Sequence, residues 1–275
     1  MRKTRRLVKA TWRELRGRRA IDLPGGRYRL AWGSRHSTRG RDYELLFRLA
    51  RDRSCVFDVG AKVGMTAMCM AGAMAKGKVV AFEAAETSCF VIERNIRLNA
   101  LEDRIVAVNA VVGSASGRSC VYHWNEISGR SSIVLPPRQG ATPIRKLAIS
   151  LDDFVQQNEL PPDLVKIDVE GAEQQVIAGM RAIMAGAKPV IALELHAWPG
   201  MSAAANAEGI LRLLQPVGYG MYWLDHGRFV EDPAALGALK GSGRAVQARA
   251  RLLLVPQGRS LPAGLESLDT RELCQ

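Results

Sequence analysis

The chain lacks any long uninterrupted apolar run. No window of its 275 residues approaches the ~20 consecutive apolar residues that a membrane-spanning helix needs. Residues 1–20 are charged, and no apolar segment of the kind found in secretory signals follows them. We therefore expect a cytoplasmic protein.

Cysteine is scarce and scattered. The chain has five cysteines, an odd number, and no two of them form a C-x-x-C pair. This pattern argues against a disulfide framework and against a zinc site. We expect buried thiols in a reducing compartment. The five are Cys55, Cys69, Cys89, Cys120 and Cys274.

Two further motifs are missing. No G-x-x-x-x-G-K-[ST] sequence occurs, which excludes a P-loop nucleotide site. No Asn or Asp followed by Pro-Pro and an aromatic residue occurs either, and that motif is typical of amino-directed nucleic-acid methyltransferases. The chain also shows no internal repeat and no low-complexity block.

Positive charge is abundant but unevenly placed. The net charge is +12, and residues 1–20 hold nine Arg or Lys against Glu14 alone, so +8 lies there and +4 in the rest. This arm could form a short helix with Val8, Trp12 and Leu15 on one face and contact an anionic membrane surface or a partner. A solvated arm is the alternative. Because the body is nearly neutral, a nucleic-acid partner is not favoured.

From Cys55 onward, short apolar runs alternate with helical patterns. This alternation predicts an α/β fold with a doubly wound, mostly parallel sheet and helices on both faces. Ligands bind such sheets at the carboxyl ends of the strands, where the strand order reverses. The predicted divisions are an arm 1–20, a strand and helix 21–54, a core domain 55–258 with an irregular insert at about 113–143, and a tail 259–275. Predicted strands are 26–32, 55–59, 78–83, 104–112, 144–149, 163–169, 189–195, 219–225 and 250–256; predicted helices are 42–50, 65–76, 86–99, 151–158, 173–184 and 203–214.

The stretch CVFDVGAKVG runs an apolar strand into a glycine turn. Its spacing is D-x-G-A-x-x-G, with Asp58, Gly60, Ala61 and Gly64 at the defined positions. A carboxylate at the start of this turn repels a pyrophosphate and suits a cationic group such as an amino-acid ammonium. Gly60 lets the backbone approach a ligand, and Gly64 permits close packing of the next helix. The turn therefore does not favour a dinucleotide.

Glu83 ends the next predicted strand, about 20 residues after Gly60. An acidic residue at this offset accepts hydrogen bonds from the hydroxyls of a ribose. A ribose and an ammonium group without phosphate describe S-adenosylmethionine. Separately, Asp58 could cap the following helix and Glu83 could be a solvated loop residue, but their joint spacing favours the cofactor.

The stretch DLVKIDVEGAE places charges at the end of another apolar strand. Lys166, Asp168 and Glu170 project to one side under strand alternation. We expect Lys166 to pair with a carboxylate of an adjoining strand, because an unpaired buried charge is costly. Glu173 falls in the first turn of a predicted helix and is interpreted as a helix-start residue. Asp168 and Glu170 are the better functional candidates.

At this point the sequence resembles the FkbM family of S-adenosylmethionine-dependent methyltransferases. The resemblance covers roughly residues 40–225. It implies a class I, Rossmann-like methyltransferase that acts on a hydroxyl group of a sugar, glycolipid, polyketide or related metabolite. The segments that carry it are VFDVGAKVG, VVAFEAAE followed by IERNIRLNAL, VNAVVG, LVKIDVEGAEQQVIAGM and PVIALELH.

Carried over to this chain, the resemblance implies a methionine site at Asp58, Gly60 and Gly64 and a ribose site at Glu83. It also implies that Asn109 and Ala110 lie beside the adenine. Two positions depart from the family pattern: Lys62 stands where Asn is usual, and Ala84-Ala85 replaces a common Pro-Asn.

Methyl transfer to oxygen needs alignment of the reactants and removal of the acceptor's proton. Candidate catalytic residues are Asp168, Glu170, Glu194 and His196, and His196 has the most suitable intrinsic pKa. A loop histidine held by a carboxylate is the alternative for His196. Asp168, Glu170 and Glu194 also offer the oxygen ligands that Mg²⁺ prefers.

The irregular insert could cover the acceptor. His123, Trp124 and residues 128–132 lie there, and aromatic side chains would suit a sugar ring. Two other functions remain open: an RNA or DNA methyltransferase, and a non-catalytic module that keeps the fold and contacts a membrane or a protein through its arm.

Overall fold

The computed structural model describes most of the chain. The described residues are 19–31, 34, 40–124, 142–197, 202–238, 248–262 and 265.

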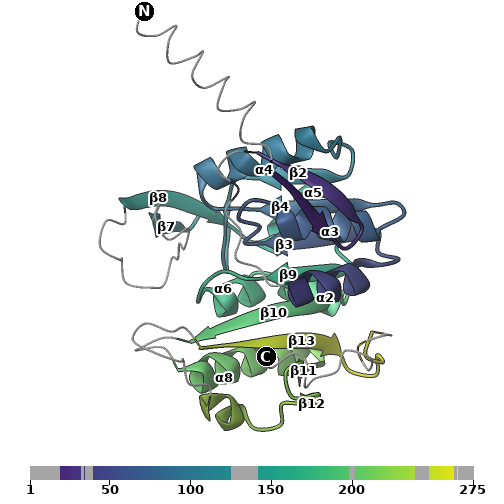
Figure 1. Cartoon of the computed structure of the whole chain (residues 1–275). Helices are drawn as coiled ribbons and strands as arrows, with labels where there is room; N and C mark the ends of the chain where they lie inside the picture. Colours follow the sequence, from purple (N-terminus) through teal and green to yellow (C-terminus); the bar gives the residue numbers. More distant parts are fainter. Residues whose placement is uncertain are drawn as a thin grey trace, which may run out of the picture.

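An eight-stranded sheet forms the centre of the molecule (Figure 1), in the order β12-β11-β13-β10-β9-β3-β4-β5. The five strands from β10 to β5 are parallel, and β13 runs antiparallel between β10 and β11. The chain order reverses between β3 and β9, so these neighbours form the switch point of a doubly wound sheet. The predicted fold class is confirmed. The strands are β3 (Cys55–Val59), β4 (Lys78–Phe82), β5 (Ile105–Val108), β9 (Leu164–Ile167), β10 (Val190–Ala197), β11 (Tyr219–Trp223), β12 (Arg228–Phe229) and β13 (Ala248–Pro256).

Helices cover both faces of this sheet because its strands are apolar on both sides. In β3, Val56 packs into one core, and Cys55 and Phe57 pack into the other. The first core includes α2, α3 and α4, and the second includes α5, α6, α7 and α8. Parallel strands buried on both faces read as near-continuous apolar runs, as these do. The helices are α2 (Gly40–Ala50), α3 (Met65–Ala73), α4 (Glu86–Leu98), α5 (Leu151–Asn158), α6 (Glu173–Ala178), α7 (Arg181–Ala185) and α8 (Ala203–Leu214), with short 3₁₀ helices at Gln215–Val217 and Pro233–Ala238.

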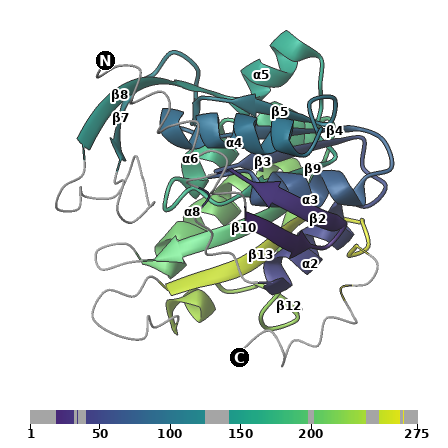
Figure 2. The same ribbon diagram turned by 45° about the horizontal axis from the view of Figure 1, so that its top comes forward.

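An N-terminal hairpin of β1 (Arg19–Leu23) and β2 (Gly26–Leu30) packs beside α3 and α4 (Figure 2). The main-chain groups of Arg29 bond to the side chain of Asn99 at the end of α4. Tyr28 lies close against Gly72 of α3: a Cβ atom added to Gly72 would lie 2.3 Å from the hydroxyl oxygen of Tyr28. The sequence predicted the second strand of this hairpin but not the first, which begins at Arg19 in the predicted arm and continues into the segment 21–54.

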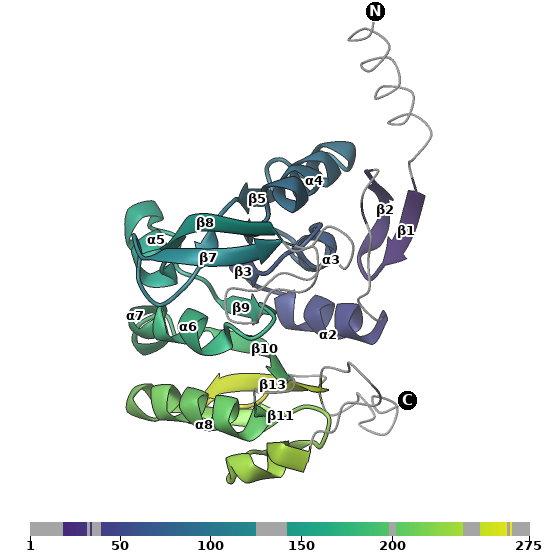
Figure 3. The same cartoon turned by 90° about the vertical axis from the view of Figure 1, so that its left-hand side faces the viewer.

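A second, three-stranded sheet has the order β6-β8-β7 and projects beside the main sheet (Figures 1 and 3). Its strands are β6 (Val111–Val112), β7 (Ser119–Trp124) and β8 (Thr142–Ile149). The irregular interpretation of 113–143 is therefore wrong at 119–124 and 142–143, which belong to the antiparallel pair of β7 and β8. Residues 125–141 lie outside the described residues. They include residues 128–132, which were predicted to cover the acceptor. The side chain of Trp124 also lies outside the described part.

Two other predicted elements are divided in the structure. The predicted strand 104–112 leaves the main sheet after β5 and joins the small sheet at β6, with Asn109 and Ala110 between them. The predicted helix 173–184 breaks into α6 and α7 at Gly179. A Cβ atom at Gly179 would meet the carbonyl oxygen of Gly113 at 2.1 Å, so the backbone must turn past that segment.

The expected burial of the thiols is confirmed for three of the four that the structure describes. Cys55, Cys69 and Cys89 are buried and free, and Cys120 is half-buried and free. Cys274 lies outside the described residues. Within the described part of the chain, none of the helices combines the length and the apolar character that a bilayer crossing requires.

Candidate functional site at the carboxyl edge of the sheet

The glycine turn between β3 and α3 has the backbone shape that the sequence predicted. The main-chain N–H groups of Gly60 and Ala61 both donate to the carbonyl of Phe82 on β4, at 3.0 Å each. Gly60 and Gly64 have φ angles of +82° and +81°, which favour glycine. A Cβ atom at Gly64 would lie 3.1 Å from Ile92 of α4, so this glycine permits close helix packing.

Glu83 closes the turn from the end of β4. Its Oε2 accepts from the main-chain N–H of Lys62 and its Oε1 from that of Ala85, both at 2.8 Å. Burial raises the pKa of Glu83 to about 7, against the lowering effect of these two amide donors. Each carboxylate oxygen still has a lone pair for a ribose hydroxyl. The side chain thus fits the predicted ribose role, which stays a prediction.

Asp58 lies beneath the turn and is fully buried. It is 0% exposed, its Oδ2 accepts from the hydroxyl of Thr66 at 2.5 Å, and its Oδ1 lies 3.1 Å from the Nζ of Lys166. The expected pairing of Lys166 with a carboxylate of an adjoining strand is confirmed. Contact between Asp58 and a ligand's ammonium stays a prediction, and in this arrangement the carboxylate supports the turn through its neighbours.

Asn109 and Ala110 lie in the link between β5 and β6, next to Glu83. The side-chain amide of Asn109 donates to the carbonyl oxygens of Glu83 and Ala84, at 2.9 and 3.3 Å. Lys146 of β8 donates to Ala84 at 2.6 Å and to the Oδ1 of Asn109 at 2.8 Å. The second sheet is thereby attached to the segments that follow β4 and β5, an attachment that the sequence did not indicate.

A group of charged side chains lies at the ends of β9 and β10. The Nε2 of His196 is 3.6 Å from Asp168 Oδ1 and 3.5 Å from Glu194 Oε1. The His196 side chain is almost fully buried, and its Nδ1 lies 2.8 Å from Glu173 Oε1. Asp168 is the open member, with its side chain 33% exposed.

The three side chains titrate differently because their partners differ. Burial raises the pKa of Asp168 to about 6, while Lys166 lowers it. Burial also opposes ionisation of Glu194, but hydrogen bonds from His196 and Arg249 lower the pKa of Glu194 to about 2. Burial alone would lower the pKa of His196, but its carboxylate neighbours raise it well above the ordinary value. These carboxylates therefore favour the charged form of His196.

This geometry alters the predicted metal set. Among the described residues, Asp168, Glu194 and His196 bring one donor atom each within 4.8 Å of one another, and Glu170 is not in that group. Glu170 has a φ of +54° in the turn beyond the strand. The set is not the all-oxygen shell that Mg²⁺ prefers. Protein cations also lie on both carboxylates: Arg249 is 2.5 Å from Glu194 and Lys166 is 3.7 Å from Asp168. The residues present do not fit Mg²⁺.

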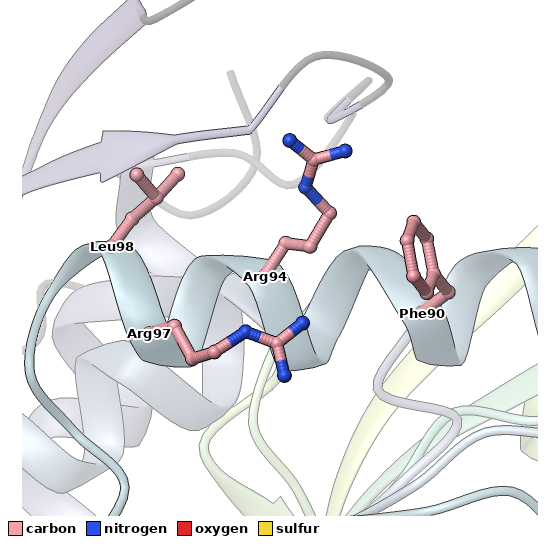
Figure 4. Close-up of a pocket in the computed structure, with 4 residues that line it drawn as sticks. All are labelled: Phe90, Arg94, Arg97 and Leu98. Carbon is pink, nitrogen blue, oxygen red and sulfur yellow. The ribbon is translucent and has the colours of Figure 1, made fainter. Parts of the chain in front are cut away.

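A separate hollow lies on α4. It has a volume of about 380 Å³ and is lined by Phe90, Arg94, Arg97 and Leu98 (Figure 4). The guanidinium of Arg94 lies 5.7 Å from the centre of the Phe90 ring.

Comparison with known proteins places the chain in a family. A family model described as "Methyltransferase FkbM domain" matches residues 58–221, more than half of the chain. The matched region begins at Asp58 and includes every predicted cofactor and catalytic residue. The chain belongs to the FkbM family of methyltransferases, a class that uses S-adenosylmethionine.

Individual relatives are distant. The methyltransferase sdnD of Sordaria araneosa is 23% identical over 154 residues, which cover 46% of this chain and 60% of that protein. Two solved structures are also similar to this chain. The methyltransferase FkbM of Methylobacillus flagellatus KT has 16% identity and a TM-score of 0.43, covering 74% of this chain and 44% of that one. A tRNA m1G37 methyltransferase of M. jannaschii has 12% identity and a TM-score of 0.48, covering 89% and 58%. At TM-scores below 0.5 these structures support no inference about the acceptor.

Proposed function

We propose that the protein is an S-adenosylmethionine-dependent O-methyltransferase that acts on a hydroxyl group of a sugar, a glycolipid or a secondary metabolite. The observation that carries the proposal is the position of Asp168. Its carbonyl packs on Gly60 of the glycine turn, and its partly exposed carboxylate lies at the end of the neighbouring strand. A base for the acceptor and the cofactor turn are therefore adjacent.

The cofactor-binding role rests on the turn and Glu83. Gly60 and Gly64 give the turn its positive-φ backbone, with Ala61 between them, and the methionine part would lie against this turn. Glu83 would accept from the ribose hydroxyls. Bound S-adenosylmethionine supplies an electrophilic methyl group on a sulfonium centre. The chain's part is to align an acceptor oxygen with that methyl, an effect worth up to ~7–11 kcal/mol in model reactions.

Among the four candidate catalytic residues, Asp168 best fits the general base. His196 is buried against Glu173 and its carboxylate neighbours favour its charged form, so it is poorly placed to accept a proton from the acceptor. Glu194 is held by Arg249, which weakens it as a base. A carboxylate whose pKa is raised to about 6 is ionised at neutral pH and is a stronger base than an ordinary one. Lys166 and His196 flank it and would stabilise its ionised form.

The test is methyl transfer from S-adenosylmethionine carrying a tritiated methyl group. The acceptor panel contains oligosaccharides, glycolipids, hydroxylated small metabolites and tRNA. We expect label in a hydroxylated small molecule or glycan. Label in tRNA alone would overturn the acceptor class and support the nucleic-acid alternative. Binding of S-adenosylhomocysteine without transfer to any acceptor would support a non-catalytic module.

A further inference from the structure

Glu173 is a fully buried carboxylate at the start of α6. It is 0% exposed, although an acidic residue in the first turn of a helix can act on the helix dipole from the surface. Burial of a carboxylate costs several kcal/mol unless its partners satisfy both oxygens. The contacts of Glu173 therefore indicate what it does.

Three segments supply donors to this carboxylate. Oε1 accepts from the main-chain N–H of Gly171 at 2.9 Å and lies 2.8 Å from His196 Nδ1. Oε2 accepts from the amide of Asn206 on α8 at 3.2 Å. The same amide also reaches the carbonyl of His196, at 3.5 Å. Glu173 thus joins the turn after β9 to β10 and α8.

These contacts fix the orientation of the His196 ring. A carboxylate accepts and cannot donate when it is ionised, so the proton of the shared bond resides on Nδ1. The opposite ring atom, Nε2, then faces Asp168 and Glu194. The groups that face the ring are Asp168 from the turn after β9, Glu194 from β10 and Glu173 from α6, and Arg249 pairs with His196 in the register of β13.

We propose that Glu173 is a positioning residue of the methyltransferase site. It holds His196 with Nδ1 protonated, so that the Nε2 edge keeps Asp168 and Glu194 side by side at the carboxyl edge of the sheet. The catalytic meaning of this arrangement rests on the proposed function, since Asp168 is the base there. The orientation of His196 itself does not depend on that function.

The experiment is ¹⁵N NMR of the histidine rings in the full-length protein. The chain has only four histidines, so the assignment of His196 by a His196→Asn variant is practicable. In the parent protein we expect a protonated Nδ1 with a downfield, slowly exchanging proton. Glu173→Gln should remove or strongly shift this resonance and leave that of His226 unchanged. Glu208→Gln, on the exposed side of α8, is the matched control and should change neither.

Several outcomes would overturn the proposal. An unprotonated Nδ1 in the parent protein does so without any variant. A folded Glu173→Gln protein with parent-like His196 shifts also does so. If Glu173→Gln fails to fold, Asn206→Ala serves instead, because it removes one donor but leaves the carboxylate on Nδ1. We then expect the Nδ1 proton to be retained with altered exchange, and its loss would contradict the proposal.

Calorimetry with S-adenosylhomocysteine separates this proposal from the function. Glu173 does not contact the glycine turn in the bonds described above, so Glu173→Gln should bind S-adenosylhomocysteine as the parent does. If the parent itself fails to bind it, the proposed function is wrong, whereas the NMR result still decides the role of Glu173.

Discussion

The backbone of Gly60 passes the main-chain carbonyl of Asp168 so closely that a Cβ atom on Gly60 would lie 1.9 Å from that oxygen. The two residues follow adjacent strands, β3 and β9, at the switch point of the sheet. Lys166 strengthens the same junction, because its Nζ contacts the carbonyl of Gly60 at 3.1 Å and the carboxylate of Asp58. The glycine turn and the loop that carries Asp168 therefore form one interlocked unit.

Gly60→Ala should destabilise the protein and abolish binding of S-adenosylhomocysteine. The added methyl meets a main-chain atom that cannot move independently, which costs ~1–3 kcal/mol as overpacking, and a positive φ costs a further ~1–2 kcal/mol. Gly117→Ala is the matched control, since its φ is +76° and nothing lies within 4 Å of the added atom. Urea unfolding measures the loss of stability in both variants. Equal losses in the two variants would mean that the contact with Asp168 contributes nothing.

Much of the fold could be predicted because the strands of the main sheet are short apolar runs with clear ends. The predicted helices 151–158 and 203–214 match α5 and α8, where Ser150 and Ser202 accept hydrogen bonds as N-caps. The break at Gly179 could not be predicted, because it depends on the tertiary approach of Gly113. The pairing of β7 with β8 was missed because their residues are more polar and more exposed than those of the main sheet.

The sequence predicted where the site lies in the fold, but not which of its side chains are buried. Asp168, Glu194 and His196 come together because β9 and β10 are parallel neighbours whose carboxyl ends lie at the same edge of the sheet. Spacing alone does not show which carboxylates are covered: Glu173 begins α6 as predicted, but neither its full burial nor that of Asp58 could be predicted. The contribution of Asn206 and Arg249 comes from tertiary packing, and no local motif in the sequence signals it.

Binding of S-adenosylhomocysteine should strengthen as the pH rises through about 7. The folded-state pKa of Glu83 is raised from 4.5 to about 7, so Glu83 stabilises the fold below pH 4.5, and this contribution is lost as the pH rises to 7. The ribose hydroxyls favour the ionised form, so binding near pH 6 should release a proton. Calorimetry in buffers of different ionisation enthalpy measures this release. Glu83→Gln should remove it, and an unchanged proton release in that variant would exclude Glu83 as its source.

Lys146→Met should loosen the attachment of the β7–β8 sheet to the main sheet. It removes the hydrogen bonds to Ala84 and Asn109, and we expect a loss of about 1 kcal/mol. Amide exchange in β7 and β8 should accelerate, and the affinity for S-adenosylhomocysteine should fall. Arg145→Met, at the exposed neighbouring position, is the control. If both variants exchange alike, the attachment does not depend on Lys146.

Deletion of residues 1–18 should preserve folding and cofactor binding and weaken binding to anionic vesicles. The cut falls at 18 because β1 begins at Arg19, inside the predicted arm. The deleted residues carry eight of the Arg and Lys and one Glu, so they are strongly basic, and salt should screen their attraction to the vesicles. Sedimentation with phosphatidylserine vesicles at low and high salt measures the effect. If the full-length chain does not sediment even at low salt, the arm has no membrane role.

Asp168→Asn should reduce turnover ~10²–10⁴-fold and leave binding of S-adenosylhomocysteine intact, because it removes the proposed base without changing the size of the side chain. The parent's rate should rise with pH through about 6 and then level off, since the raised pKa of Asp168 leaves it protonated and inactive below that value. His196→Asn should reduce the rate less, because His196 would only position the carboxylates. Asp103→Asn, in the exposed turn before β5, is the control for a lost surface charge. Rates are measured with the hydroxylated acceptor that takes up the label, with and without a chelator. If the chelator abolishes turnover and Mg²⁺ restores it, a metal deprotonates the acceptor and Asp168 is not the base.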